Sequence, residues 1–280
     1  MIKSFCKINL SLRVLNKTKK RLHNIQTNTV QLNLCDEIFV KKIDDKKDII
    51  IFKGKFKKNI FKNNNSISKT LEILRKKKLI KNQNEKFEIV INKKIPTFSG
   101  LGGGTSNAAF LIKHFVKVKN YKNIFKFFEK KIGSDLPLFI YKQCFQKSLQ
   151  LILNYKKKHN LHVLLVYPNI PCSTANIFSK VKKFSNSSKL NYSGKLASPK
   201  FIKMLQYDKN DLQKIVSKKF KIIPELLSQI SLKKDCYFSR MTGSGSVCYG
   251  LFKSKRAATT GMKSIKKKFP KYWCVVTKTI

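Results

Sequence analysis

The sequence predicts an α+β protein built from two halves, and three observations carry this prediction. Segments with alternating apolar and polar residues, typical of strands, are interspersed with segments whose apolar residues recur at helical spacing. Two glycine-rich loops, at residues 100–104 and 242–246, each follow an expected strand. The pattern restarts near residue 160, in a chain whose 280 residues suffice for two domains. We therefore expect one domain at residues 1–155 and another at residues 156–280.

The first half begins with a strand in which apolar side chains from Ile8 to Val14 alternate with polar ones. This alternation predicts a half-buried strand. Lys7 and Asn9 project from the same face of it because they lie two positions apart. Further strands are expected at residues 25–39, 48–52 and 87–92, and helices at residues 67–74, 108–116 and 124–128.

A short connector after the last of these helices carries a candidate catalytic carboxylate. Gly133 is expected to end the helix, and Pro137 biases Leu136 toward an extended conformation. Asp135 lies on this tight connector, so its side chain need not be buried in packing. Taken alone, a Ser-Asp pair before Leu-Pro is usually only a turn.

The second half repeats the alternation of strands and helices. Strands are expected at residues 163–167, 236–241 and 272–277, and helices at residues 174–181, 212–230 (one helix or two) and 256–269. The loop Thr242–Ser246 leads into an apolar segment, which fits a ligand loop and a hairpin turn equally well.

The charge of the chain is extreme but evenly spread. It has 61 Lys and Arg against 14 Asp and Glu, a net charge of +47. Such a balance is typical of nucleic-acid-binding proteins. Here, however, the lysines form only short runs, without a long basic tail. We expect a generic attraction for anionic metabolites and no specific nucleic-acid partner.

Composition also bears on compartment and metal content. No apolar run approaches the roughly 18 residues of a membrane span, and the first residues lack the apolar region of a signal peptide. The seven cysteines are scattered without a Cys-x-x-Cys pair, which favours reduced thiols in the cytoplasm. The four histidines show no metal-binding spacing, so no metal ligands are expected. Because the sequence has no long apolar run, no membrane partner is expected either.

Residues Pro96–Ala109 form the most informative segment of the chain. Glycines occupy four of the five positions Gly100–Gly104, between an expected strand and an expected helix. Thr105, Ser106 and Asn107 lie where that helix would be capped. Glycines let a polyanion approach the backbone, and the helix N-terminus favours negative charge. The segment therefore predicts a phosphate-binding loop.

Two familiar phosphate loops do not fit this segment. It is not a Walker A motif, because no Gly-Lys-Ser/Thr follows the glycines, and Gly102–Gly104 are contiguous, unlike the dinucleotide-binding fingerprint. The alternative to a phosphate loop is a flexible linker.

Three separated blocks together resemble the GHMP kinase superfamily. These are Lys7–Leu10, Pro96–Ala109 and Met241–Gly245. Three further segments resemble the branch that phosphorylates a cytidine-linked methylerythritol in the non-mevalonate isoprenoid pathway: His23–Thr27, Gly133–Pro137 and Pro168–Phe178. The resemblance covers nearly the whole chain. It implies a ribosomal-protein-S5-like N-terminal domain and a ferredoxin-like C-terminal domain.

The resemblance also assigns roles. Asp135 would be the general base for the substrate hydroxyl, and Lys7 would keep it ionised and stabilise the developing alkoxide. The cofactors implied are ATP and Mg²⁺, the ion being held by protein ligands or mainly by phosphates and water. ATP would be bound by Lys93, Pro96, Gly100, Leu101, Gly102, Gly103, Gly104, Thr105 and Ser106. The cytidine-linked substrate would be bound by Asn9, His23, Asn107, Thr174, Phe178, Gly243, Ser244 and Gly245.

The chain departs from the pattern of this branch before His23. The branch has Asp-Gly-Tyr there, whose Tyr stacks on cytosine, whereas this chain has Lys20-Arg21-Leu22. Leu22 can contact a base but provides no aromatic ring, so Phe178 would carry more of the stacking. Asn169 also stands where a glycine is usual.

Two alternatives remain open at this stage. One is another small-molecule kinase of the superfamily, acting on mevalonate or homoserine. The other is a polyanion- or RNA-binding protein on a decayed kinase fold, which the charge of +47 favours and the presence of both Lys7 and Asp135 disfavours. The expected assembly is a monomer or a weak homodimer.

Overall fold

The computed structural model of the chain describes residues 1–18, 22–58, 60–61, 64–188 and 196–280. These residues form two compact units, neither of which is continuous in sequence. The first unit comprises Met1–Cys6, Leu34–Thr97 and Gly102–Ile140, and the second comprises Lys7–Asn33, Phe98–Leu101 and Tyr141–Ile280. Strands β1 (Ile2–Lys17) and β2 (His23–Ile43) pair with each other and contribute residues to both units.

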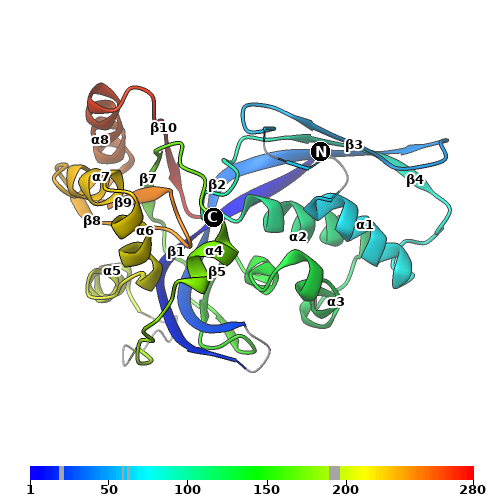
Figure 1. Ribbon diagram of the computed structural model, residues 1–280, viewed down its shortest axis with the longest axis horizontal. Coiled ribbons are helices and arrows are strands. Elements are labelled where there is room, and N and C mark those ends of the chain that lie inside the picture. Colours follow the sequence, from blue (N-terminus) through cyan, green and yellow to red (C-terminus); the bar gives the residue numbers. More distant parts are fainter. Residues whose placement is uncertain (19–21, 59, 62–63, 189–195) are drawn as a thin grey trace. The chain divides into compact units, whose positions relative to one another are not determined.

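The first unit combines a sheet with helices. Strand β4 (Lys86–Asn92) pairs in parallel with β3 (Ile49–Lys53) and antiparallel with residues Glu37–Ile43 of β2. Helices α1 (Ser66–Lys76), α2 (Gly103–Phe115) and α3 (Lys122–Ile132) lie along one side of these strands (Figure 1). The 3₁₀ helix η1 (Leu136–Ile140) follows α3.

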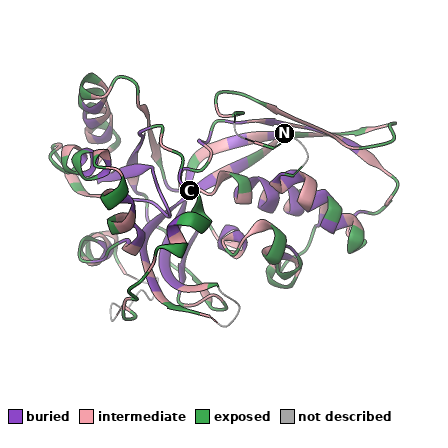
Figure 2. Cartoon of the chain, viewed as in Figure 1, coloured by how far each residue is buried: buried purple, intermediate pink, exposed green. Residues whose placement is uncertain are grey.

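Alternation of side chains along the strands explains the core of the first unit. Phe87, Ile89 and Ile91 are buried on β4, while the residues between them are half-buried. They pack with apolar residues of α1 and α2, such as Leu71 and Leu111. The buried stripes of these helices therefore face the sheet (Figure 2).

The second unit contains a four-stranded sheet of order β10-β7-β9-β8, antiparallel throughout. Its strands are β7 (His162–Tyr167), β8 (Cys236–Met241), β9 (Cys248–Phe252) and β10 (Trp273–Lys278). In the same unit β5 (Gln143–Gln146) pairs with residues Thr27–Val30 of β2 and with β6 (Ile152–Asn154). The helices are α4 (Thr174–Ser179), α5 (Ser198–Gln206), α6 (Asp211–Lys219), α7 (Ile222–Ser231) and α8 (Lys255–Lys268).

Three local expectations from the sequence are wrong. Residues Cys6–Leu12 of β1 are buried on both faces, not on one, because their polar side chains find hydrogen-bond partners inside the unit. Helix α2 begins at Gly103, so Thr105–Asn107 lie within the helix and not at its cap. Leu136 is in η1 and is not extended, because Pro137 is tolerated in a first helical turn, where its missing N–H is not needed.

All seven cysteines lie among the described residues, and none of them forms a disulfide there. Burial raises the pKa of the thiols of Cys236 and Cys274 to about 11. Within the described part of the chain no helix is both long and apolar enough to cross a membrane.

Candidate functional site

The glycine loop shapes the start of helix α2 in the first unit. Gly102 is the N-cap residue, with φ of 70° in the left-handed region, and as a glycine it has no side chain with which to cap the helix. Gly103 and Gly104 form its first turn. A Cβ atom on Gly104 would meet only the Ser66 hydroxyl, 3.7 Å away, so this turn has open space beside it. An uncapped, glycine-lined helix N-terminus is suited to a phosphate group.

The preceding residues of the loop are held in the second unit by backbone hydrogen bonds. Ser99 and Phe98 accept from Val247 and Cys172 at 3.1 and 2.7 Å. Lys7 donates to the carbonyl of Leu101 at 3.0 Å. Gly100 has φ of 81°, and a Cβ atom there would collide with the carbonyl oxygen of Thr242. Glycine at position 100 is thus required by backbone geometry and by close packing.

Ser106 and Asn107, both predicted to bind ligands, make buried hydrogen bonds within the protein. The Ser106 hydroxyl donates to the carbonyl of Phe5 at 2.6 Å and contacts the Ser4 hydroxyl at 2.7 Å. Ser4 also donates to Oδ1 of Asn107 at 2.8 Å. These bonds attach α2 to β1. Thr105, which is half-buried, lies in the same helical turn.

Lys93 is paired with a buried carboxylate that was not among the predicted site residues. Its side chain is 2% exposed and Nζ contacts Asp36, which is fully buried. Oδ1 of Asp36 accepts hydrogen bonds from the backbone N–H groups of Lys94 and Ile95 at 2.7 and 2.9 Å. A Cβ atom on Gly103 would lie 3.5 Å from Nζ of Lys93, so the ammonium group borders the first turn of α2. The buried Pro96 continues the same segment.

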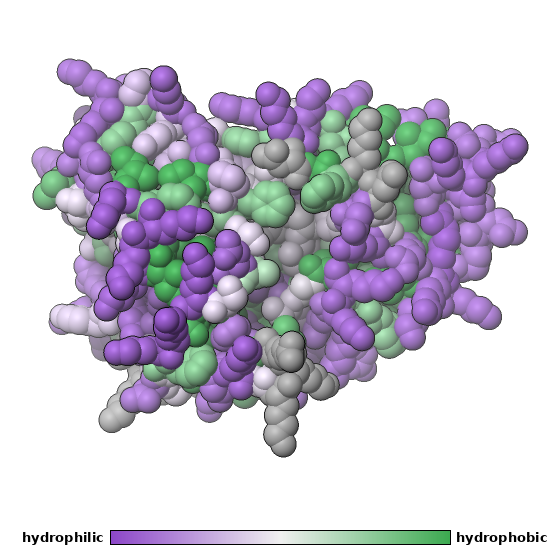
Figure 3. All heavy atoms as spheres, viewed as in Figure 1, coloured by the Kyte–Doolittle hydropathy of each residue, from purple (hydrophilic) through white to green (hydrophobic). Residues whose placement is uncertain are grey.

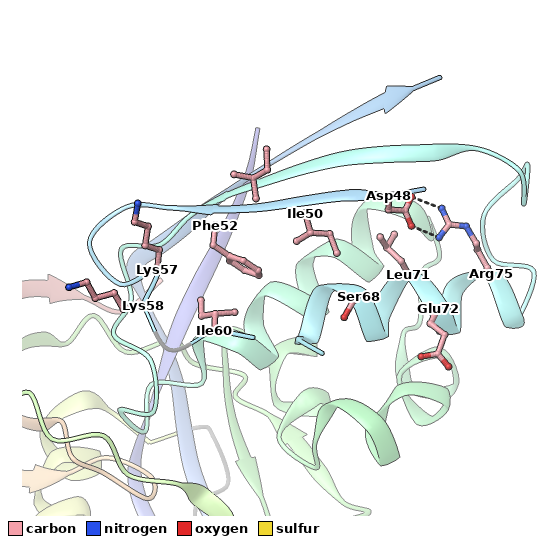
Figure 4. A pocket seen from close by; sticks show the side chains of 11 residues that line it. Asp48, Ile50, Phe52, Lys57, Lys58, Ile60, Ser68, Leu71, Glu72 and Arg75 are labelled. Carbon is pink, nitrogen blue, oxygen red and sulfur yellow. Dashed lines mark hydrogen bonds and ion pairs between the residues drawn. The ribbon is translucent and has the colours of Figure 1, made fainter. Parts of the chain in front are cut away.

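A cavity of about 980 Å³ lies in the first unit between β3 and α1. Ile50, Phe52 and Leu71 give it an apolar wall, and the ion pair between Arg75 and Asp48 closes one end (Figure 4). The two guanidinium–carboxylate bonds are 2.6 and 2.8 Å long. Helix α1 also packs on α2, so the same helix borders the cavity and the glycine turn. The sequence predicted a strand at residues 48–52, but nothing in it predicted the cavity.

Lys7 belongs to a buried polar network of the second unit. Its side chain is 3% exposed, and Nζ donates to Oδ1 of Asn9 at 2.6 Å. Asn9 donates through Nδ2 to the Thr27 hydroxyl at 2.8 Å, and its backbone N–H donates to the Thr242 hydroxyl at 2.9 Å. The predicted juxtaposition of Lys7 and Asn9 on one strand face is confirmed. Thr27 thus orients the side-chain amide of Asn9, and Thr242 holds its backbone.

The second glycine loop approaches the same network. A Cβ atom on Gly243 would lie 3.2 Å from Oδ1 of Asn9. Ser244 contacts the Thr174 hydroxyl at 3.1 Å. Gly245 has φ of 80°, in the left-handed region. The structure thus brings together, within one unit, predicted residues from three distant segments.

Asn210 holds this loop in place and was not predicted as a site residue. Its Nδ2 donates to the carbonyls of Met241 and Gly243 at 2.7 and 2.9 Å. Its Oδ1 accepts from the backbone N–H of Leu212 at 3.0 Å, which caps α6. An Asn at the start of an amphipathic helix could have been identified as a cap from the sequence, but its contacts with the loop depend on the fold.

Asp135 lies in the first unit, on the turn between α3 and η1. Its carbonyl accepts from the backbone N–H of Leu138 at 3.1 Å, and the residue is half-buried. The predicted end of the helix at Gly133 and the short connector that carries Asp135 are therefore present, but a 3₁₀ helix follows in place of the expected extended residue. Lys7, its proposed catalytic partner, lies in the second unit.

His23 and Phe178, predicted to bind a base, are neighbours in the second unit. Their ring centroids are 5.2 Å apart at an interplanar angle of 39°. Burial lowers the pKa of His23, and Lys17 lowers it further, so the imidazole is neutral at neutral pH. Leu22 is 48% exposed, whereas Lys20 and Arg21 lie outside the described residues.

The backbone conformation at position 169 explains why an asparagine can stand where a glycine is usual. Its φ is 61°, in the left-handed region that glycine and asparagine tolerate best. Its Nδ2 also donates to the carbonyl of Lys271 at 2.9 Å.

Comparisons with known proteins bear on the class of protein that carries this site. Two family models match the chain, the GHMP kinases N terminal domain at residues 65–142 and the GHMP kinases C terminal model at residues 199–271. The 4-diphosphocytidyl-2-C-methyl-D-erythritol kinase of Pelagibacter ubique (strain HTCC1062) is 39% identical, covering 100% of this chain and 98% of that relative. The protein of the same name from Buchnera aphidicola subsp. Schizaphis graminum (strain Sg) is 34% identical over 90% of this chain and 84% of the relative.

Solved structures agree on the fold. A crystal structure of 4-(cytidine 5'-diphospho)-2C-methyl-D-erythritol kinase matches with a TM-score of 0.74 at 17% identity, over 99% of this chain and 98% of the other. A crystal structure of mevalonate kinase reaches 0.72 at 15% identity, with the same coverage of 99% and 98%. The two family models show that the chain is a GHMP kinase, the class that uses ATP to phosphorylate small molecules. Within this class, the chain belongs to the family of 4-diphosphocytidyl-2-C-methyl-D-erythritol kinases.

Proposed function

We propose that this chain transfers the γ-phosphoryl group of ATP to the 2-hydroxyl of 4-diphosphocytidyl-2-C-methyl-D-erythritol, in the non-mevalonate route to isoprenoid precursors. The observation that carries the proposal is the glycine-lined N-terminus of α2, whose N-cap residue is Gly102 and provides no capping side chain. It occurs in a chain that is 39% identical over its full length to a kinase of that name. We place the reaction in the cytoplasm.

ATP fits the first unit in two ways. The N–H groups of the first turn of α2 are suited to the triphosphate, because Gly102–Gly104 leave the backbone approachable. The cavity between β3 and α1 is large enough for a nucleoside and has the apolar wall that a purine requires. We therefore propose that the base and ribose enter this cavity while the phosphates lie at α2, with the Lys93 segment between them.

The residues present fit a magnesium ion that is held mainly by its substrate. Among the described residues no group of three or more His, Cys, Asp or Glu side chains could hold a metal ion. Mg²⁺ typically keeps several waters and binds through substrate phosphates. The Thr105 hydroxyl is the better protein ligand in the turn, because the Ser106 hydroxyl is fully buried and already bonded to Phe5 and Ser4. Bound Mg²⁺ would neutralise charge on the phosphoryl group being transferred.

Two side chains carry the chemistry that we propose. The Asp135 carboxylate accepts the proton of the 2-hydroxyl as that oxygen attacks the γ-phosphorus. The Lys7 ammonium stabilises the negative charge that develops on the oxygen. Asn9 keeps Lys7 in place through its hydrogen bond of 2.6 Å, and Asn9 is itself held by Thr27 and Thr242. Phosphoryl transfer needs little more than such positioning and charge stabilisation.

The second unit supplies the groups that would hold the cytidine-linked substrate. His23, with its neutral imidazole, can both donate and accept hydrogen bonds at the edge of a base, and Phe178 offers a ring for stacking. Thr174, Ser244 and Gly243 lie beside the Asn9 network, where we propose that they hold the polar remainder of the substrate.

A second candidate is a kinase of the same fold with a different acceptor, such as mevalonate. The similarity of folds favours it as much as it favours the cytidine-linked acceptor, since the two TM-scores are 0.74 and 0.72. The relatives at 39% and 34% identity and the neighbouring His23 and Phe178 rings favour the cytidine-linked acceptor. We propose that the protein acts as a monomer or weak homodimer. We also propose that the chain divides into an N-terminal domain at residues 1–155 and a C-terminal domain at residues 156–280.

One assay separates these candidates. The purified chain is given ATP and Mg²⁺ with, in turn, the cytidine-linked methylerythritol, mevalonate and homoserine, and ADP release is followed. We expect turnover with the cytidine-linked compound alone. Turnover with mevalonate or homoserine only would contradict the assignment. Saturable, sequence-selective RNA binding without turnover would instead support the polyanion-binding alternative. Figure 3 does not favour that alternative, because hydrophilic side chains are spread over the visible face and are not gathered in one stripe.

A further inference from the structure

Phe184 is an exposed aromatic residue beside the proposed base-binding pair. Its side chain is 47% exposed, and its ring centroid lies 6.5 Å from that of His23 at an interplanar angle of 43°. The imidazole of His23 therefore has an aromatic neighbour in Phe178, at 5.2 Å, and another in Phe184. The exposed part of this ring can stack on the ring of a ligand.

Hydrogen bonds on its C-terminal side hold this residue near His23. The backbone N–H of Ser185 donates to the carbonyl of Val14 on β1 at 2.8 Å. Gln26 on β2 donates to the Ser187 hydroxyl at 3.0 Å and accepts from the backbone N–H of Ser188 at 2.7 Å. Gln26 is 3% exposed and lies three positions after His23, so the segment is attached to the strand that carries the imidazole.

We infer that Phe184 is the second aromatic ring of the cytosine site, in the place of the ring that position 22 lacks. The inference rests on the proposed function, because that function supplies the cytidine. The Phe178 and Phe184 ring centroids lie 5.2 and 6.5 Å from that of His23, within the roughly 4.5–7 Å over which aromatic rings interact, so a base bonded to the imidazole would enter between groups that include both rings. Phe178 and Phe184 thereby offer a base two aromatic contacts, and Leu22 is not needed for either.

The charge around Phe184 suits the same ligand. Lys182 and Lys183 directly precede it and are exposed, and Lys17 acts electrostatically on His23. The substrate carries a diphosphate next to its cytidine. Cations beside the base site therefore attract this substrate more strongly than an uncharged polyol.

The test compares single substitutions in the full chain. We measure KM for the cytidine-linked substrate and for ATP, and the dissociation constant of cytidine 5'-diphosphate by calorimetry. Phe184→Ala should raise the first KM and weaken cytidine diphosphate binding about five- to tenfold, the lower end of the loss expected for one base–aromatic stack. KM for ATP, kcat and the melting temperature should stay within the range of wild type, and Phe184→Tyr should restore binding.

Two control variants separate stacking from general effects. Phe127→Ala removes a phenylalanine of similar exposure, 45%, from α3 in the other unit and should change neither KM. Leu22→Ala should change binding less than twofold.

The outcomes distinguish this inference from the proposed function. If the wild-type chain phosphorylates the cytidine-linked substrate but Phe184→Ala matches it in KM and in cytidine diphosphate affinity, the role of Phe184 is wrong and the proposed function stands. If the wild-type chain does not turn this substrate over yet binds cytidine diphosphate in a Phe184-dependent way, the ring assignment stands and the proposed function falls. Absence of both turnover and binding overturns both.

Discussion

At the scale of single residues, buried polar side chains with fixed hydrogen-bond or ion-pair partners shape the candidate site. Lys7, Lys93 and Asn9 are each at most 3% exposed, yet each has a defined partner. Buried polar groups without partners are costly, so these side chains are held in one orientation. A catalytic group benefits from the same constraint, because positioning supplies much of the rate in phosphoryl transfer.

The first prediction concerns the proposed base. Asp135→Asn should leave the fold and ATP binding unchanged but lower kcat by roughly 10²–10⁴-fold, because the amide cannot accept the hydroxyl proton. Steady-state kinetics with the cytidine-linked substrate, together with calorimetric titration of an ATP analogue, make the measurement. An Asn variant whose kcat is within about threefold of wild type would show that another group is the base.

The second prediction concerns the pair between Lys93 and Asp36. Lys93→Met should lower the free energy of unfolding by about 3 kcal/mol, because it leaves a buried carboxylate without its counterion. Adding Asp36→Asn should recover much of this loss, since the Asn oxygen can still accept from the N–H groups of Lys94 and Ile95. Urea unfolding of the single and double variants gives the values. If the double variant is as unstable as the single one, the pair is not what stabilises this segment.

At the scale of elements, the start of α2 shows how glycine placement produces a binding surface. Gly102 turns the chain in the left-handed region, and the next two glycines leave the first two positions of the helix without side chains. Helices usually begin with a side chain that caps the first N–H groups. Because this helix lacks one, a ligand can take the place of the cap.

The third prediction tests this surface without disturbing the packing. Gly104→Ala should raise KM for ATP at least several-fold, because a methyl group would stand where the phosphates approach. Its melting temperature should be equal or higher, since alanine favours helices by about 1 kcal/mol over glycine and the space beside Gly104 is open. A stable variant with unchanged KM for ATP would remove this turn from the phosphate site.

Regular periodicity made some elements predictable and left others hidden. The apolar spacing of α1 and the alternation in β4 were enough to predict both, and β8 was predicted with the bounds that the structure has. Strand β5, with the sequence Gln-Cys-Phe-Gln, was missed because all four of its residues are buried, two of them glutamines. A glutamine is usually exposed, and its burial here depends on partners that only the folded chain provides. Helix α5 was missed because only Phe201 and Leu205 of its residues are buried, too few to form a recognisable stripe.

The same reasoning explains which site residues could be predicted. Gly100–Gly104 and Gly243 were predictable because a glycine cluster is a local signal. Asp36 and Asn210 were not, since each acts on a segment that is distant in sequence and that only folding brings near. The Phe184 ring was missed for the same reason.

At the scale of the whole molecule, a few buried titratable groups link stability to pH. His159 is 1% exposed, its Nδ1 contacts the Ser198 hydroxyl at 3.0 Å, and its ring stacks on Phe201 at 4.0 Å. Burial, together with the charges of Lys157 and Lys158, lowers the pKa of His159 to about 4. The folded protein therefore holds this imidazole neutral.

The fourth prediction follows from that difference between folded and unfolded chains. In the unfolded chain the His159 imidazole binds a proton near pH 6.5, whereas in the folded protein it does so only near pH 4. The contribution of His159 to the free energy of unfolding is therefore fully present above about pH 6.5 and is lost as the pH falls toward 4. Between pH 7 and pH 5 the loss from His159 should be about 2 kcal/mol in the free energy of unfolding. Urea unfolding at both pH values measures it, and His159→Phe should show a correspondingly smaller drop. Equal drops in the two proteins would mean that other groups cause the pH dependence.

The division of the chain between the two units has a consequence for its synthesis. Residues 7–33 and 141–280 belong to one unit, with most of the other unit encoded between them. On the ribosome, β1 and the first part of β2 therefore emerge long before β5, the strand that pairs with β2, has been translated. Unpaired strand edges are prone to associate with other chains. The edge of β2 that pairs with β5 therefore stays unpaired while most of the first unit is translated. During this interval a chaperone would protect the nascent chain from association most effectively.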